Sequence, residues 1–167
     1  RPVRALMSSG STPESGPYAR EVTKAMNYVL RVAESNDDGL IAGGGAENRS
    51  MYGHGFAMLF LAECLGVETN KENEARLRKV LEKAIALTKK SQSDLGAQND
   101  HAGGWIYTPD GNNDVGSVTV TKLQALRAAR NAGMKVPRET IERAVAYLKV
   151  CQQPDGGICY SYRSRGA

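Results

Sequence analysis

Cysteine is scarce in this chain of 167 residues, which contains three. Cys64, Cys151 and Cys159 are an odd number at irregular spacing, so they form no disulfide framework, and no CxxC pair suggests zinc. Cys64 and Cys151 fall on predicted apolar helix faces, where cysteine packs as a small hydrophobe. Only Cys159, in the last turn, is expected to be exposed enough to react. This usage favours a reducing compartment, and cytoplasmic is the default expectation for localisation, with an exported parent protein left open.

Long apolar runs and basic clusters are missing as well. No stretch of about 18 apolar residues is present, so no membrane span is predicted. The start, RPVRALMSSG, lacks the apolar core of a signal peptide, but it also lacks an initial Met, so a longer parent protein stays open. The net charge is +4, and Lys and Arg alternate with Glu on helical patterns such as RLRKVLEK. Without a basic cluster that includes stacking aromatic residues, nucleic-acid binding is not expected.

Apolar residues recur at helical spacing in five segments, which predicts an all-α fold. The expected helices cover residues 18–35, 50–65, 71–93, 117–132 and 137–153. The second, SMYGHGFAMLFLAECL, is apolar on nearly every side and should be buried on most faces. Residues 1–17 contain SSGSTPESGP and are expected to form a poorly ordered arm or linker, which leaves 18–167 as the folded domain.

Three turns of similar composition follow three of these helices. They are NDDGLIAGG at 36–44, GGWIYTPDGNND at 103–114 and PDGGICYSY at 154–162. Each follows an apolar helix and a polar segment rich in Gln, Ser or Asn, and each contains Gly and then an apolar or aromatic residue. Repetition at about fifty residues predicts stacked helix pairs that bury their faces against their neighbours.

The segments GGWIY at 103–107 and QQPDGGI at 152–158 resemble the turn repeats of squalene–hopene cyclases and of protein prenyltransferase β subunits. Together with MYGHGFAMLFLAE and SVTVTKLQAL, they are similar to the bacterial prenyltransferase and squalene oxidase repeat proteins. The resemblance implies a partial α/α toroid, with helices 50–65 and 117–132 inside and the others outside. It implies an apolar, isoprenoid-like ligand or a protein partner. Five helices form only an arc, to be completed by further repeats or by self-association.

The resemblance also locates where catalytic groups would lie. Cyclases of this kind have Asp-x-Asp-Asp at the start of an inner helix, and zinc prenyltransferases have Asp-x-Cys. This chain has Asp114-Val115-Gly116-Ser117, so Gly116 replaces both the proton-donating Asp and the zinc-binding Cys. We therefore expect a non-catalytic binding domain without cofactor or metal. The alternative is a terpenoid cyclase or prenyltransferase-like enzyme whose acids lie outside this segment.

The candidate ligand-binding residues are polar or aromatic side chains near the turns and helix starts: Tyr52, His54, Trp105, Tyr107, Asp114, Ser117 and Tyr160. Each also has a structural interpretation. Asp114 is expected to cap the helix that follows it, and His54 to be a neutral core residue bonded to a neighbouring loop. Trp105, Tyr107 and Tyr160 would tie neighbouring turns together, unless they form a platform for a carbohydrate or isoprenoid.

Overall fold

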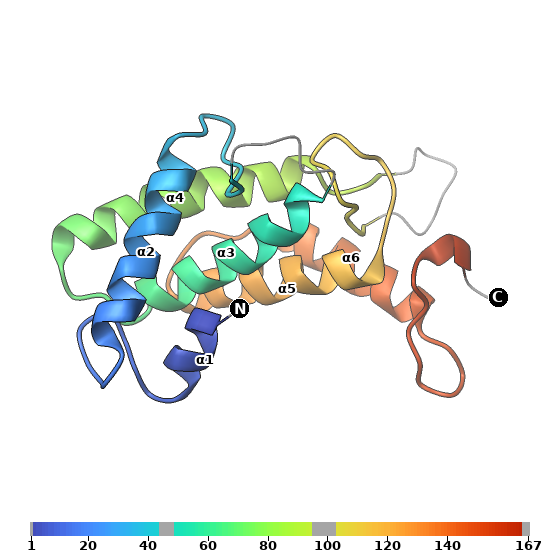
Figure 1. Ribbon diagram of the computed structural model, residues 1–167. Coiled ribbons are helices and arrows are strands. Elements are labelled where there is room, and N and C mark those ends of the chain that lie inside the picture. Colours follow the sequence, from blue (N-terminus) through green and yellow to red (C-terminus); the bar gives the residue numbers. More distant parts are fainter. Residues whose placement is uncertain (1, 44–48, 95–102, 165–167) are drawn as a thin grey trace.

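The computed structural model describes residues 2–43, 49–94 and 103–164 (Figure 1). Within these ranges the chain is helical and contains no strand, which confirms the all-α prediction; Gln152 and Ile158 form an isolated bridge. A 3₁₀ turn, η1 (Tyr162–Ser164), follows the α-helices. The helices are α1 (Pro2–Ser8), α2 (Ala19–Glu34), α3 (Ser50–Leu65), α4 (Lys71–Lys90), α5 (Gly116–Asn131) and α6 (Arg138–Cys151). In the described residues, no helix combines the length and the apolar character that crossing a membrane requires.

The predicted arm over residues 1–17 contains a helix, α1, which the sequence analysis did not expect. Two interactions dock it. The Arg4 side chain donates two hydrogen bonds to Glu63 of α3, at 2.9 and 2.8 Å. Val3, Leu6 and Met7, at helical spacing, pack against the core. The first part of the predicted arm is therefore a short amphipathic helix, and its apolar spacing was a signal in the sequence.

Helices α3 and α5 lie side by side and are the most buried, as predicted (Figure 1). Eleven of the sixteen residues of α3 are buried, against seven of twenty in α4. The two helices run parallel. Tyr52 contacts Ser117 near the start of both helices, and Gly55 contacts Thr121 further along both. A Cβ at Gly55 would overlap the Thr121 side chain, which explains why a buried helix tolerates glycine there.

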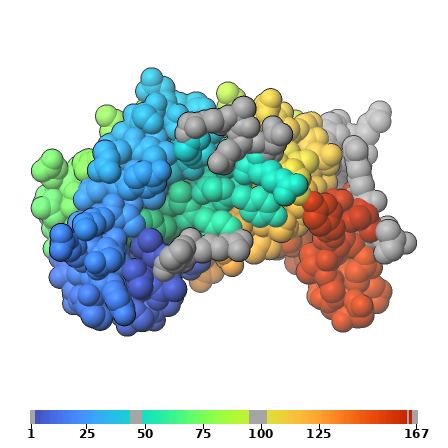
Figure 2. Space-filling model, in the orientation of Figure 1, coloured from blue at the N-terminus to red at the C-terminus, as the bar shows by residue number. Residues whose placement is uncertain are grey.

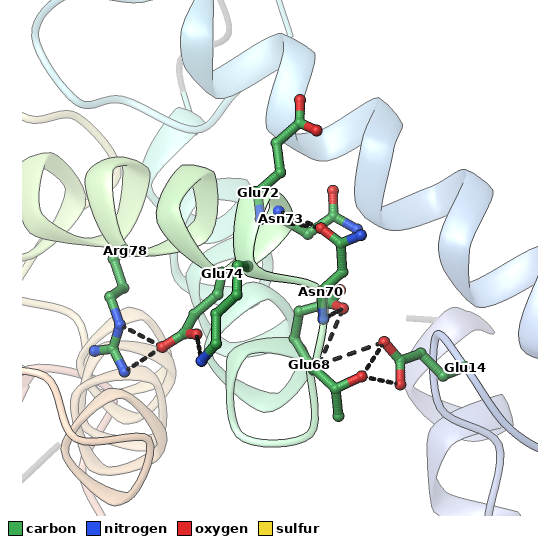
Figure 3. Close-up of polar contacts among 9 residues, drawn as sticks. Glu14, Glu68, Asn70, Glu72, Asn73, Glu74 and Arg78 are labelled. Atoms are coloured by element: carbon green, nitrogen blue, oxygen red, sulfur yellow. Dashed lines mark hydrogen bonds and ion pairs between the residues drawn. The ribbon is translucent and has the colours of Figure 1, made fainter.

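The start of α4 shows how an exposed helix is stabilised by its own sequence (Figure 3). Asn70 caps the helix: its Oδ1 accepts the backbone N–H groups of Glu72 and Asn73 at 3.0 and 3.1 Å. Glu74 pairs with Lys71 and Arg78 at 2.9 and 3.0 Å, the spacing of neighbours on one helix face. This charged surface suits a helix on the outside of the molecule.

Each of the three similar turns contains a glycine with a positive φ angle. Gly39, Gly103 and Gly156 have positive φ angles of 87°, 137° and 89°, a region that side chains disfavour. A Cβ on Gly39 would overlap the backbone of Lys83 in α4, and one on Gly103 the backbone of Arg143 in α6. The first of these turns therefore lies directly against α4 and the second against α6, and glycine permits both the angle and the approach.

Two residues after the glycine, each of the first two turns bonds to one of the two most buried helices. The N–H of Ile41 is accepted by Nδ1 of His54 in α3 at 3.1 Å. The N–H of Trp105 is accepted by Oγ1 of Thr119 in α5 at 3.1 Å. The sequence repeat is thus a structural repeat, in which equivalent contacts are made by different side chains.

Candidate functional site

Four of the seven candidate residues meet at the N-terminal ends of α3 and α5. The Tyr52 hydroxyl is hydrogen-bonded to the Ser117 hydroxyl, and the Tyr107 hydroxyl to that of Tyr160. The Tyr52 and Tyr107 rings are tilted by 35° with centroids 5.8 Å apart. We call Tyr52, Tyr107, Ser117 and Tyr160 the tyrosine cluster. It lies at the surface, where Tyr160 and Ser117 are exposed.

The helix starts themselves hold the cluster together. Met51 N donates to Tyr107 O at 3.0 Å, and Gly116 N donates to Tyr160 O at 2.8 Å. In the described residues no side chain caps α3 or α5, so carbonyls of the later turns satisfy N–H groups that a helix start leaves free. The second and third turns thus bring Tyr107 to the start of α3 and Tyr160 to the start of α5.

The cluster carries a cation beside its rings. The Arg49 guanidinium lies over the Tyr107 ring, 5.0 Å from its centroid, in a cation–π arrangement. The hydrogen bond with the Tyr160 hydroxyl raises the pKa of Tyr107, with burial adding to the effect. Tyr107 therefore keeps its proton at neutral pH, and the cluster offers neutral hydroxyls together with one positive charge.

A groove runs from the cluster along the line between α3 and α5. Its volume is about 680 Å³. Gly53 has no side chain and no described neighbour close to its Cβ position, so it leaves this surface of α3 open. The described residues that line the groove carry no charge: Tyr52, Gly53, Phe56, Ser117, Val120, Thr121 and Gln124. The groove therefore suits an apolar molecule that has a polar group near the cluster.

The predicted cap at Asp114 is wrong. Val115, not Asp114, occupies the N-cap position of α5. The carboxylate is buried, and its Oδ2 accepts hydrogen bonds from the Tyr147 hydroxyl and the Tyr162 backbone N–H, both at 2.7 Å. Its Oδ1 is buried and has no hydrogen-bond partner in the described parts of the chain. Burial, followed by this hydrogen bond, raises the pKa of Tyr147, which stays the donor. Asp114 therefore ties α6 and the C-terminal segment to the start of α5.

His54 is fully buried and lies away from the groove. Because its Nδ1 accepts the Ile41 N–H, its Nε2 carries the proton and faces Thr88 Oγ1 at 3.1 Å. Burial, and then the charge of Lys122, hold the His54 pKa well below its usual value. This geometry agrees with the structural interpretation, a neutral imidazole bonded to a neighbouring loop.

Trp105 is also fully buried and does not reach the surface. Its indole N–H donates to the Thr88 carbonyl near the end of α4 at 2.8 Å. The ring thus anchors the turn 103–107 in the core and satisfies its polar atom there. Of the seven candidates, His54, Trp105 and Asp114 lie inside the protein, while the other four form the surface cluster.

Lys122 is a buried residue that the sequence analysis did not single out. Its Nζ lies 2.7 Å from Met51 O at the start of α3 and 3.9 Å from Met51 Sδ. Burial lowers the Lys122 pKa well below its usual value. The signal was present in the sequence, because Lys122 shares the helix face of Val118, Ala125 and Ala129, which are all buried.

The cysteines offer no reactive thiol. Cys159 is buried, contrary to prediction, because the turn folds its backbone N–H onto Cys151 O at 2.9 Å. Burial raises the pKa of Cys64 to about 12, so this thiol stays protonated. In the described residues, His, Cys, Asp and Glu side chains nowhere gather in a group of three that could hold a metal ion.

Comparison with protein-family models, curated proteins and solved structures finds no match to this chain. Assignment to the repeat proteins named above therefore stays a prediction from the sequence.

Proposed function

We propose that this domain binds an apolar, isoprenoid-like molecule in the groove between α3 and α5 and performs no chemistry on it. The observation that carries the proposal is the groove itself: about 680 Å³, lined by uncharged described residues and bordered at one end by the tyrosine cluster. The apolar floor, Phe56 and Val120, would remove an isoprenoid chain from water. The hydroxyls of Tyr52 and Ser117 would receive its polar end.

The arrangement of the helices supports the same proposal. Parallel, deeply buried α3 and α5 with an exposed, charged α4 match what a partial α/α toroid requires of inner and outer helices. The position that would need an acid or a thiolate is Gly116, whose N–H bonds to Tyr160 O. This residue supplies neither a proton nor a metal ligand, so binding without turnover is the simplest function for the site.

One observation favours the enzyme alternative. Asp114 is buried next to the cluster, with one carboxylate oxygen lacking a partner in the described residues. A buried acid of this kind is unusual in a purely structural role. In the alternative, Asp114 belongs to an enzyme whose remaining acids lie in other repeats of a longer protein.

Farnesol is a suitable probe, measured by isothermal titration calorimetry. Val120→Asp places a charge on the groove floor and should weaken farnesol binding at least tenfold, about 1.4 kcal/mol. Val67→Asp is the matched control, because Val67 is similarly exposed but outside the groove. Equal affinities in the wild type and both variants, or no binding by the wild type, would contradict the proposal. Conversion of farnesyl diphosphate by the wild type but not by Asp114→Asn would favour the enzyme.

A further inference from the structure

The third turn lacks the contacts that its two equivalents make. A Cβ at Gly39 or Gly103 would overlap the next outer helix, whereas a Cβ at Gly156 would meet no described atom within 4 Å. Ile41 and Trp105 are 2% and 0% exposed, whereas Ile158, at the same place in the third turn, is 53% exposed. The third turn therefore has the geometry of a repeat interface without the next helices.

Helix α6 is also less covered by other parts of the chain than α4, whose equivalent residues lie sixty positions earlier. Ala84 of α4 and its equivalent Ala144 of α6 are both buried, so the two helices share an inward face. Ile85 is 5% exposed, but its equivalent Val145 is 40% exposed. A groove of about 370 Å³ lies between α5 and α6 at this place. Much of its lining is apolar: Leu123, Leu126, Val136, Ile141 and Val145.

The opposite end of the molecule is also incompletely covered. Beside its buried face, helix α2 carries Ala25 and Val29, which are half-buried, and beyond them Tyr28, which is 60% exposed. A groove of about 690 Å³ lies between α1, α2 and α3, with Ala25, Val29 and Phe60 among its lining residues. Figure 2 shows these N-terminal segments (blue) at one end and the C-terminal segment (red) projecting at the other.

We propose that copies of this chain associate head to tail. The C-terminal end of one copy, formed by α6 and residues 152–160, packs on α1 and α2 of the next. Within one chain, Gly39 packs against α4 and Gly103 packs against α6. In a second copy, the first helix equivalent to α4 and α6 is α2. Gly156 then lies against α2 of the second copy, and Ile158 enters its groove of about 690 Å³.

Two features favour a second copy and a head-to-tail arrangement. The new contact continues an interface that this chain already makes twice, at Gly39 and at Gly103. That interface joins two different surfaces, a turn and a helix backbone, so its repetition between copies is heterologous and not self-pairing. Both surfaces expose a large apolar residue that such a contact would cover, Ile158 on one and Tyr28 on the other.

The test is sedimentation velocity of the 167-residue chain over a range of concentrations. Ile158→Asp places a charge on the C-terminal surface, the tail, and Tyr28→Asp places a charge on α2 at the N-terminal surface, the head. Both side chains are exposed, so both variants should fold. The wild type should form concentration-dependent oligomers, and each variant alone should sediment as a monomer. Mixing the two variants should give a species of two chains and nothing larger, since one intact head and one intact tail remain.

Val67→Asp is the control, because Val67 is exposed and lines neither of the two end grooves, and it should assemble like the wild type. A monomeric wild type at every concentration would overturn the proposal. So would oligomers of Ile158→Asp alone, or a mixture of the two blocked variants that stays monomeric. Circular dichroism of each variant verifies that loss of assembly is not loss of fold. Farnesol binding by a monomeric wild type would leave the groove proposal standing while this one fails.

Discussion

The starts of α3 and α5 both hold the turn that precedes them, but they do so through different side chains. Each accepts the N–H of the preceding turn, α3 with an imidazole nitrogen of His54 and α5 with a hydroxyl of Thr119. Arg49 lies five residues before His54 and is exposed. Asp114 lies five residues before Thr119 and is buried. The comparison shows that a residue type alone does not reveal its role in a repeat. His54 resembles a ligand in the sequence, but its equivalent is a threonine.

The largest expected effect concerns the two turn residues that these helices hold. Trp105→Ala should cost about 3–5 kcal/mol of the free energy of unfolding, because it removes a fully buried aromatic ring. Ile41→Ala removes a smaller buried side chain and should cost less, about 2–4 kcal/mol. Urea unfolding followed by circular dichroism measures both. A smaller cost at Trp105 would mean that α5 is not anchored by its turn as α3 is.

The next effect separates Asp114 from Arg49. Asp114→Ala leaves the Tyr147 hydroxyl and the Tyr162 N–H without their acceptor and should cost about 1–3 kcal/mol. Arg49→Ala removes a cation–π contact at the surface and should cost less than about 1 kcal/mol. Asp114→Asn keeps an oxygen acceptor and should lie between wild type and Asp114→Ala. Equal costs at the two positions, again by urea unfolding, would contradict the difference in burial between them.

The smallest effect is a pH dependence that comes from His54 of α3 and has no counterpart in Thr119 of α5, whose hydroxyl does not titrate in this range. The folded state holds the His54 pKa below the unfolded value of 6.5, so the unfolded chain binds the extra proton as the pH falls. Stability should therefore decrease below pH 6.5, by at most about 1.4 kcal/mol per pH unit from this group. Urea midpoints at pH 7.5 and 5.5 test this. His54→Gln, which cannot titrate, should show a smaller difference between the two, whereas an unchanged difference would exclude His54 as the source.

The sequence alone predicted the features that depend on neighbouring residues in the chain. The apolar run of α3 predicted its bounds, Ser50–Leu65, because burial on most sides leaves a nearly continuous apolar pattern. The three glycine turns were also visible, since positive φ angles select glycine. The docking of His54 on a loop was predicted correctly from the general rule that buried polar groups find partners.

Prediction failed where a role depends on distant residues. Asp114 looks like a helix cap in its local sequence, but its partners Tyr147 and Tyr162 are 33 and 48 residues away. The pairing of Tyr52 with Ser117 likewise follows from the parallel packing of α3 on α5 and from no local pattern. Helix α1 was missed because serine, glycine and proline nearby outweighed three apolar residues.

The bond between Met51 N and Tyr107 O has a consequence for the order in which the protein is made. A ribosome delivers α3 long before residue 107, so this helix leaves the exit tunnel with its first turn incomplete. The Met51 N–H finds its acceptor only after Tyr107 has been synthesised. In the same way, the Gly116 N–H of α5 finds its acceptor only after Tyr160 has been synthesised. During translation, therefore, the turns that contain Tyr107 and Tyr160 each complete a helix that was synthesised earlier, α3 and α5.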